Sequence, residues 1–385
     1  MAHIVQFTVN GLAGRKNPVH LKLDRHVNVV FGVNGSGKTS ILRILDSAMT
    51  GEVSPLANIP FEKAEVIIHS MNEDCDFTYT FDATAFNEVR QSELELTSEQ
   101  GSLTPVARRV RLERMTRMKL EKGWTISPNP KGTKRWQHTF LPVSRLYPQA
   151  VRGESARSES DLDKAFEQDL AQHWVTYFSR IQSQVRKIQQ EGLAEILSEV
   201  LLPKNTEQEN DRLAWETAYA QTVSFLQRQG ANGQRTPSAE QFQARYKNEA
   251  LVRNVVQQID GIERRITEAM SSRSKLQLLL DKLFSGRKKI AFNDTSVDVI
   301  SNEKNIGIRS LSSGEKHLLR ILFEVINVEQ SSLLIDEPEI SLHIDWQRAL
   351  VQTLRELNPR AQLILASHSP EVMAEVPDAN IFALD

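Results

Sequence analysis

The chain has 385 residues and a formal net charge of −2, with 40% hydrophobic and 25% charged residues. This composition is typical of a globular protein with one large core or two smaller ones, and it argues against a strongly basic surface that coats nucleic acid. Because no stretch approaches the roughly eighteen uncharged apolar residues that cross a bilayer, and the N-terminus lacks a secretion signal, we expect a cytoplasmic protein with no membrane partner.

Short apolar strands separated by turns fill most of residues 1–154. We expect strands at Ile4–Val9, Val19–Leu23, Val27–Phe31, Ala64–His69, Phe77–Phe81 and Thr139–Val143. One convincing helix interrupts them, directly after Lys38. This pattern predicts an N-terminal lobe that is rich in antiparallel β-structure.

Residues 32–39 match the phosphate-loop pattern G-x-x-x-x-G-K-[ST], between a buried strand and a helix. A glycine-rich turn at a helix N-terminus lets backbone N–H groups converge on phosphate oxygens. We expect Lys38 to reach the β and γ phosphates of ATP and Thr39 to hold Mg²⁺. The predicted nucleotide contacts are Asn34, Gly35, Ser36, Gly37, Lys38, Thr39 and Ser40.

Basic side chains gather in residues 108–122, where they alternate with Val110, Leu112 and Met115. This alternation is typical of strands with one wet face. Both a DNA-facing surface and an ordinary solvated face remain open.

The period changes in residues 155–287, where apolar side chains recur at steps of three and four. They form two stripes, Leu162, Phe166, Leu170, Trp174, Phe178, Ile181, Val185 and Ile188, then Leu251, Val255, Ile259, Ile262, Ile266 and Met270. The polar segment 227–237 separates them. We predict a helical hairpin or small bundle whose helices, of about thirty residues, reach about 45 Å. The stripes either pack on each other and on the core or form a platform for a partner.

Residues 288–385 return to apolar strands that alternate with helices, which predicts a mostly parallel sheet covered on both faces. The strand 332–336 ends in Asp336 and is followed by Glu337, where a Mg²⁺-coordinating Asp and a catalytic base are expected. A second buried strand ends before His368, which we expect to donate a hydrogen bond to the γ phosphate.

These features, in this order, resemble the ABC-related ATPases of the branch that includes SMC, RecF, RecN and OLD proteins. The run 335–343, Ile-Asp-Glu-Pro-Glu-Ile-Ser-Leu-His, is especially similar to RecF and OLD-like members. The resemblance makes His368 the switch histidine, Ser341 part of the D-loop, and Ser312, Ser313, Gly314 and Glu315 part of the signature. Two signature positions depart from the family pattern, because Ser313 stands where glycine is usual and Glu315 where glutamine is common.

The resemblance covers about the first 150 and last 100 residues. It implies an α/β fold, an ABC-type P-loop ATPase with a mixed or parallel sheet, an antiparallel β lobe and an inserted helical hairpin or bundle. It also implies head-to-tail dimers that share ATP sites. A glutamine that senses Mg²⁺ is expected in the first lobe, and both Gln137 and Gln149 remain candidates.

A short helical insertion without an effector domain is similar to stand-alone ATPase subunits of bacterial anti-phage systems such as PARIS or Septu. We therefore expect an ATP-driven switch that controls a separately encoded nuclease, with DNA or a phage-derived molecule as its trigger. Because OLD nucleases continue into a metal-dependent TOPRIM domain after the last strand, where this sequence stops, any DNA cleavage is expected from another polypeptide. The alternative is a RecF-like ATPase that acts on DNA itself in repair or recombination.

Overall fold

The computed structural model describes residues 2–84, 123–129, 135–143, 159–202, 213–230, 236–284, 288–293 and 296–384. The chain divides into two compact units, one of Met1–His173 with Leu279–Asp385 and one of Trp174–Leu278. The second unit lies inside the helical insertion expected at 155–287. The basic run 108–122 and Gln149 fall outside the described residues.

The centre of the first unit is a five-stranded sheet in which every pairing is parallel. Its strands, in spatial order, are β13 (Ile381–Ala383), β3 (Val27–Phe31), β12 (Gln362–Ser367), β11 (Ser332–Asp336) and β7 (His138–Leu141). β11 and β12 are buried along their whole length because both faces of the sheet are covered, as their continuous apolar sequence predicts. The expected parallel core is confirmed.

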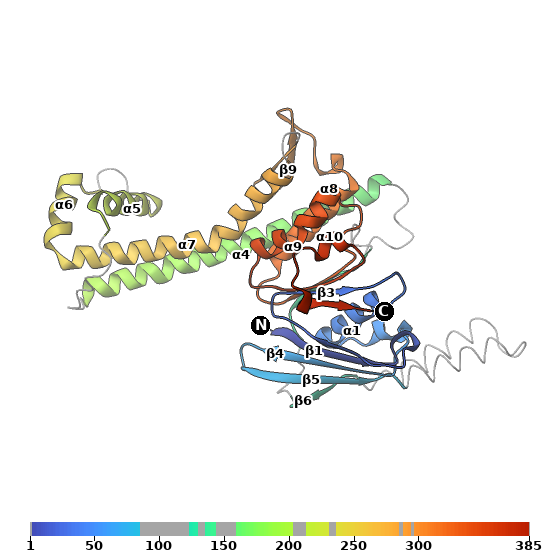
Figure 1. The fold of residues 1–385 in the computed structure, drawn as a ribbon. Coiled ribbons are helices and arrows are strands. Elements are labelled where there is room, and N and C mark those ends of the chain that lie inside the picture. The colour runs from blue at the N-terminus through green and yellow to red at the C-terminus, as the bar shows by residue number, and fades with distance from the viewer. Residues whose placement is uncertain are drawn as a thin grey trace, which may run out of the picture. The chain divides into compact units, whose positions relative to one another are not determined.

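Helices cover the two faces of this sheet. Figure 1 shows α1 (Lys38–Thr50) on one side and α8 (Ser313–Asn327), α9 (Ile344–Leu357) and the short α10 (Pro370–Met373) on the other. In α8, every apolar residue from Leu318 to Ile326 is buried, as expected for a helix that packs on a sheet.

A second, antiparallel sheet lies beyond α1. Its order is β2 (Val19–Lys22), β1 (Ala2–Asn10), β4 (Lys63–Ser70), β5 (Cys75–Asp82) and β6 (Thr125–Ser127). One core joins it to the parallel sheet, because Ile41 and Leu45 of α1 belong to the same buried cluster as Val66 of β4 and Ile364 of β12. The predicted α/β fold class, with an antiparallel lobe beside a parallel core, is confirmed.

The remaining elements of the first unit are short. A three-stranded sheet has the order β10 (Lys304–Asn305), β9 (Val297–Ser301) and β8 (Lys289–Phe292). The 3₁₀ helices are η1 (Leu12–Gly14), η2 (Ser54–Asn58), η5 (Ile308–Ser310) and η6 (Asp378–Asn380). The η5 turn leads directly into α8 and so places the predicted signature.

The insertion consists of α4 (Glu159–Leu201), α5 (Trp215–Arg228), α6 (Ala239–Asn248) and α7 (Ala250–Leu283). The expected helix length of about thirty residues is wrong for α4, which has 43. At about 1.5 Å per residue, α4 is about 65 Å long. It continues because the polar residues after Ile188 are good helix formers and Gly192 does not end it. None of the described helices combines the length and apolarity that crossing a membrane requires.

Within the second unit the predicted stripes pack on each other. Ile259, Ile262 and Ile266 of α7 form a buried cluster with Phe225 of α5, and Val185 of α4 packs against it. A second cluster joins α5, α6 and α7 at the end of the hairpin where α5 and α6 lie (Figure 1). In this part of the insertion the apolar periodicity therefore serves the packing of the helices on one another.

Candidate active site

The turn between β3 and α1 has the backbone of an anion-binding loop. Gly35 and Gly37 have φ angles of 86° and 98°, in the left-handed region that favours glycine. A Cβ built at Gly35 meets no atom within 4 Å, so the outer side of the loop is open. Val33 and Asn34 are exposed, whereas Ser36 is buried beneath the loop. The loop thus presents backbone at the N-terminus of α1.

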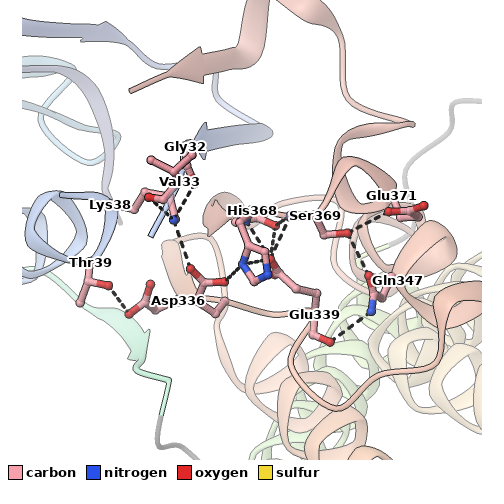
Figure 2. A network of polar contacts seen from close by, with 12 residues as sticks. Gly32, Val33, Lys38, Thr39, Asp336, Glu339, Gln347, His368, Ser369 and Glu371 are labelled. Atoms are coloured by element: carbon pink, nitrogen blue, oxygen red, sulfur yellow. Dashed lines mark hydrogen bonds and ion pairs between the residues drawn. The ribbon is translucent and has the colours of Figure 1, made fainter. Parts of the chain in front are cut away.

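Lys38, the first residue of α1, turns back under this loop. Its side chain is only 4% exposed. The ammonium group donates hydrogen bonds to the carbonyl oxygens of Gly32 at 2.8 Å and Val33 at 3.3 Å (Figure 2). It also lies 3.3 Å from Oε1 of Glu337. This buried cation therefore links the loop to the end of β11.

Thr39 and Asp336 form the second link between these segments. The Thr39 hydroxyl donates to Oδ2 of Asp336 at 2.9 Å, although 297 positions separate the residues (Figure 2). Asp336 is fully buried at the end of β11. A hydroxyl and a carboxylate side by side are the oxygen ligands that Mg²⁺ prefers, so this pair fits the predicted metal.

Glu337 and His368 meet beside Lys38, as the sequence predicted for one site. The carboxylate of Glu337 shares a hydrogen bond with Nδ1 of His368, and the Glu337 backbone N–H donates to the Ala366 carbonyl at 2.8 Å. Glu337 has a φ of 50°, uncommon for a residue with a side chain. The His368 side chain is half exposed. A carboxylate and an imidazole therefore face the same space.

Glu339 is a buried carboxylate that sequence reasoning did not select. Its Oε1 accepts hydrogen bonds from the Ser367 hydroxyl at 2.6 Å and from the backbone N–H groups of His368 at 2.8 Å and Ser369 at 3.1 Å. Ligand atoms of Glu337, Glu339 and His368 lie within 4.8 Å of one another, an arrangement that suits a cation. The only signal in the sequence is an acidic residue two positions after Glu337.

Gln347 of α9 extends this network. Its amide donates to the Leu342 carbonyl at 3.0 Å. Its oxygen accepts from the Ser369 hydroxyl at 2.9 Å (Figure 2). A polar residue in an amphipathic helix carries no sign of such a role, so the sequence offered no means of finding it.

These groups surround a pocket of about 410 Å³. It is lined by Asn34, Gly35, Gly37, Lys38, Thr39, Ser40, Val143, Glu337, Ile340 and His368. Most of the predicted nucleotide-binding and catalytic residues are therefore brought together, and Val143 and Ile340 are additions. The open loop and the ammonium group of Lys38 fit the phosphates of a nucleoside triphosphate, and the oxygen atoms of Thr39 and Asp336 fit its metal.

The predicted signature occupies a different place. Ser312 caps α8, with its hydroxyl accepting from the Glu315 N–H at 3.3 Å, while Ser313 is exposed. Gly314 is pressed against the D-loop, because a Cβ there would lie 2.2 Å from the carbonyl oxygen of Ser341. As far as the structure describes the chain, residues 312–315 and Ser341 are absent from the lining of the Lys38 pocket. Gln137 is exposed just before β7.

Comparison with known proteins gives short matches to two curated relatives. "Retron Vc95 probable ATPase" from Vibrio cholerae serotype O1 biovar El Tor is 35% identical over 96 residues, which is 22% of this chain and 19% of the relative. "Retron Ec83 probable ATPase" from Escherichia coli is 25% identical over 127 residues, 28% of this chain and 23% of the relative. The chain thus spans about a fifth of the length of the curated relatives it matches.

Among solved structures, the Smc head domain from Pyrococcus furiosus, with an extended coiled coil and bound to the C-terminal domain of ScpA, is 14% identical, with a TM-score of 0.43. That match covers 100% of this chain and 93% of the other. The SMC head domain from Thermotoga maritima is 10% identical, with a TM-score of 0.41, over 96% and 91% of the two chains. The family model described as "AAA ATPase domain" matches residues 3–373. Since this match spans nearly the whole sequence, the chain belongs to the AAA ATPase domain family, which confirms the predicted ATPase.

Proposed function

We propose that this ATPase hydrolyses ATP with Mg²⁺ in the pocket beside Lys38. The observation that carries the proposal is the meeting of Lys38, Thr39, Asp336, Glu337 and His368, from three distant segments, at the C-terminal edge of one parallel sheet. Ligands of open parallel sheets bind at this edge, where loops and helix N-termini converge.

Each side chain has a distinct task in this proposal. The loop N–H groups and Lys38 bind the phosphates, and the hydroxyl of Thr39 and the carboxylate of Asp336 hold the metal. Bound Mg²⁺ supplies positive charge that offsets the charge developing on the phosphate oxygens. Glu337 accepts the proton of the attacking water, and His368 orients Glu337 and donates a hydrogen bond to the reacting phosphate.

We further propose that two copies meet head to tail and share their sites. The capped N-terminus of α8 carries exposed Ser312 and Ser313 and does not line the pocket of its own chain. Because the first N–H groups of a helix attract anions, this turn suits a phosphate bound by a second copy.

At the level of biology, we propose a cytoplasmic conformational switch that controls a separately encoded nuclease in anti-phage defence, with DNA or a phage-derived molecule as the trigger. The similarity to two retron ATPases supports this role. ATP-driven closure of the two ATPase copies would move their insertions relative to each other. An effector that prefers one of the two arrangements would then be bound or released.

The catalytic assignment is tested by comparing Glu337→Gln with Lys38→Ala. The amide of Glu337→Gln keeps the shape of the carboxylate but cannot take a proton, so nucleotide binding is retained while turnover falls by about 10² or more. Lys38→Ala weakens binding itself because it removes the buried cation. Fluorescent-nucleotide titration and phosphate release measure the two effects. Wild-type turnover in Glu337→Gln would refute the assignment.

The effector role is tested by co-purification with the neighbouring gene product. The intact chain is compared with one in which residues 158–285 are replaced by a short linker, after confirming that the shortened chain still binds ATP. Loss of the partner with the insertion is expected. Equal recovery of the partner with both chains would show that the insertion does not hold the partner. DNA-stimulated ATP hydrolysis without any partner would favour the RecF-like alternative.

A further inference from the structure

The predicted signature contains an ion pair that its sequence does not reveal. Nζ of Lys288, just before β8, lies 2.8 Å from Oε2 and 3.0 Å from Oε1 of Glu315 in the first turn of α8. Both side chains are largely buried, at 23% and 16% exposure. The Ser312 backbone N–H also donates to Glu315 at 2.6 Å, which completes a capping box. Lys288 and the capping box therefore hold both oxygens of Glu315.

Glu315 stays ionised in this position. Burial by itself raises the pKa of the carboxyl group, but the hydrogen bonds from Lys288 and Ser312 outweigh burial, so the pKa of Glu315 is lowered. A negative charge in the first turn of α8 favours the helix, yet it repels any phosphate that approaches the same turn.

Other nearby cations are already held by carboxylates of α4. Lys316 lies 2.7 Å from Asp163, and Arg309 lies 2.8 Å from Glu167. Lys288, by contrast, directs its ammonium group at Glu315 and at the Ser310 carbonyl, 3.4 Å away. Its location fits a cation whose task is to balance Glu315.

We propose that Lys288 is a positioning residue for ATP hydrolysis, which neutralises Glu315 and fixes it in the capping box so that the α8 turn can receive the phosphates of a second copy. The inference rests on the proposed shared site. Glutamine and glutamate both suit the third position of a capping box, so the box itself does not require the negative charge of Glu315. Compensation by Lys288 explains how a charged residue is accommodated at this position.

The test is a charge-neutralisation series in the full-length chain. Lys288→Met should lower kcat about tenfold, because Glu315 then faces the phosphate uncompensated. Nucleotide binding to the isolated chain should not change, since Lys288 does not line the Lys38 pocket. Lys288→Arg should retain activity, and adding Glu315→Gln to Lys288→Met should restore kcat to within about twofold of the wild type. Lys289→Met, at an exposed neighbouring position, is the matched control.

Two comparisons separate failure of this inference from failure of the shared site. If Ser312→Arg abolishes hydrolysis while Lys288→Met keeps wild-type kcat, the shared site stands and the role of Lys288 is wrong. If Lys288→Met is impaired but Glu315→Gln does not rescue it, Lys288 acts through folding and not through charge, which also overturns the inference. If Ser312→Arg has no effect, the shared site fails and the inference fails with it. Thermal melting of each variant verifies folding.

Discussion

At the scale of single residues, the run from Asp336 to Glu339 shows how neighbouring carboxylates acquire different surroundings. Asp336 meets the Thr39 hydroxyl, Glu337 meets Lys38 and His368, and Glu339 accepts hydrogen bonds from the backbone after β12. The left-handed backbone of Glu337 turns successive side chains in different directions. Their different partners therefore distinguish Asp336, proposed to hold the metal, from Glu337, proposed to be the base, and from Glu339, which has no role in the proposed mechanism.

His3 of β1 has an environment that opposes its charged form. Burial lowers its pKa from 6.5 to about 4, and the charges of Arg25 and His69 act in the same direction, against a smaller opposite effect of Asp76. Between these values the unfolded chain binds a proton that the folded chain does not. Protons therefore favour unfolding, and this contribution to stability is present above pH 6.5 and is lost as the pH falls toward 4.

We predict that His3→Gln makes stability less sensitive to acid. The wild-type urea midpoint should fall between pH 7.5 and pH 5 by more than that of His3→Gln, because glutamine does not titrate. His20→Gln, on the neighbouring strand β2, is the matched control for replacing a histidine with glutamine. Parallel changes in wild type and His3→Gln would show that His3 protonates freely in the folded protein.

At the scale of elements, two glycines in the long helices of the insertion have opposite surroundings. A Cβ at Gly192 of α4 would lie 2.3 Å from Cγ1 of Ile262, whereas a Cβ at Gly261 of α7 meets no atom within 4 Å. Gly192 is therefore needed for the close approach of α4 and α7, and Gly261 only adds freedom to the unfolded chain.

We predict that the two alanine substitutions change stability in opposite directions. Gly261→Ala should raise the free energy of unfolding by about 0.5–1 kcal/mol through helix propensity. Gly192→Ala gains the same propensity but forces Ile262 aside, so it should lower the free energy of unfolding by about 1–3 kcal/mol. Urea unfolding followed by far-ultraviolet circular dichroism measures both. Stabilisation by Gly192→Ala would mean that α4 and α7 are not packed this closely.

At the scale of the whole molecule, the proposed shared site makes each chain incomplete. The pocket beside Lys38 and the signature turn would act on different nucleotides, so a defect in one chain leaves one normal site in a mixed dimer.

We predict that mixing two inactive variants restores hydrolysis. Ser312→Arg blocks the signature turn and Lys38→Ala disables the pocket, yet a dimer of one of each contains one intact pair. Up to about a quarter of wild-type activity is expected from an equal mixture, since about half of randomly formed dimers are mixed and each has one site. Phosphate release measures the rescue, and mixing two differently tagged Ser312→Arg preparations is the control. If mixed dimers form without any rescue, independently firing shared sites are ruled out.

The sequence alone determined the features that depend on neighbours along the chain. Glycines at fixed offsets predict the loop before Lys38, continuous apolar runs predict the buried strands β11 and β12, and three- and four-residue steps predict α4 and α7. These signals are local, because backbone conformation and burial set them within one element. The residues proposed to bind phosphate were therefore identifiable, and their roles stay predictions.

Which distant groups meet depends on how the chain folds in three dimensions. Thr39 reaches Asp336 across 297 positions, Lys288 reaches Glu315 across 27, and Gln347 reaches the end of β12. The neighbour of Gly192 in α4 is likewise set by the fold, since Ile262 of α7 fills the space beside it. For Thr39 and Asp336 the physical reason is the order of strands in the parallel sheet, which brings remote loops to one edge, and no local pattern encodes that order.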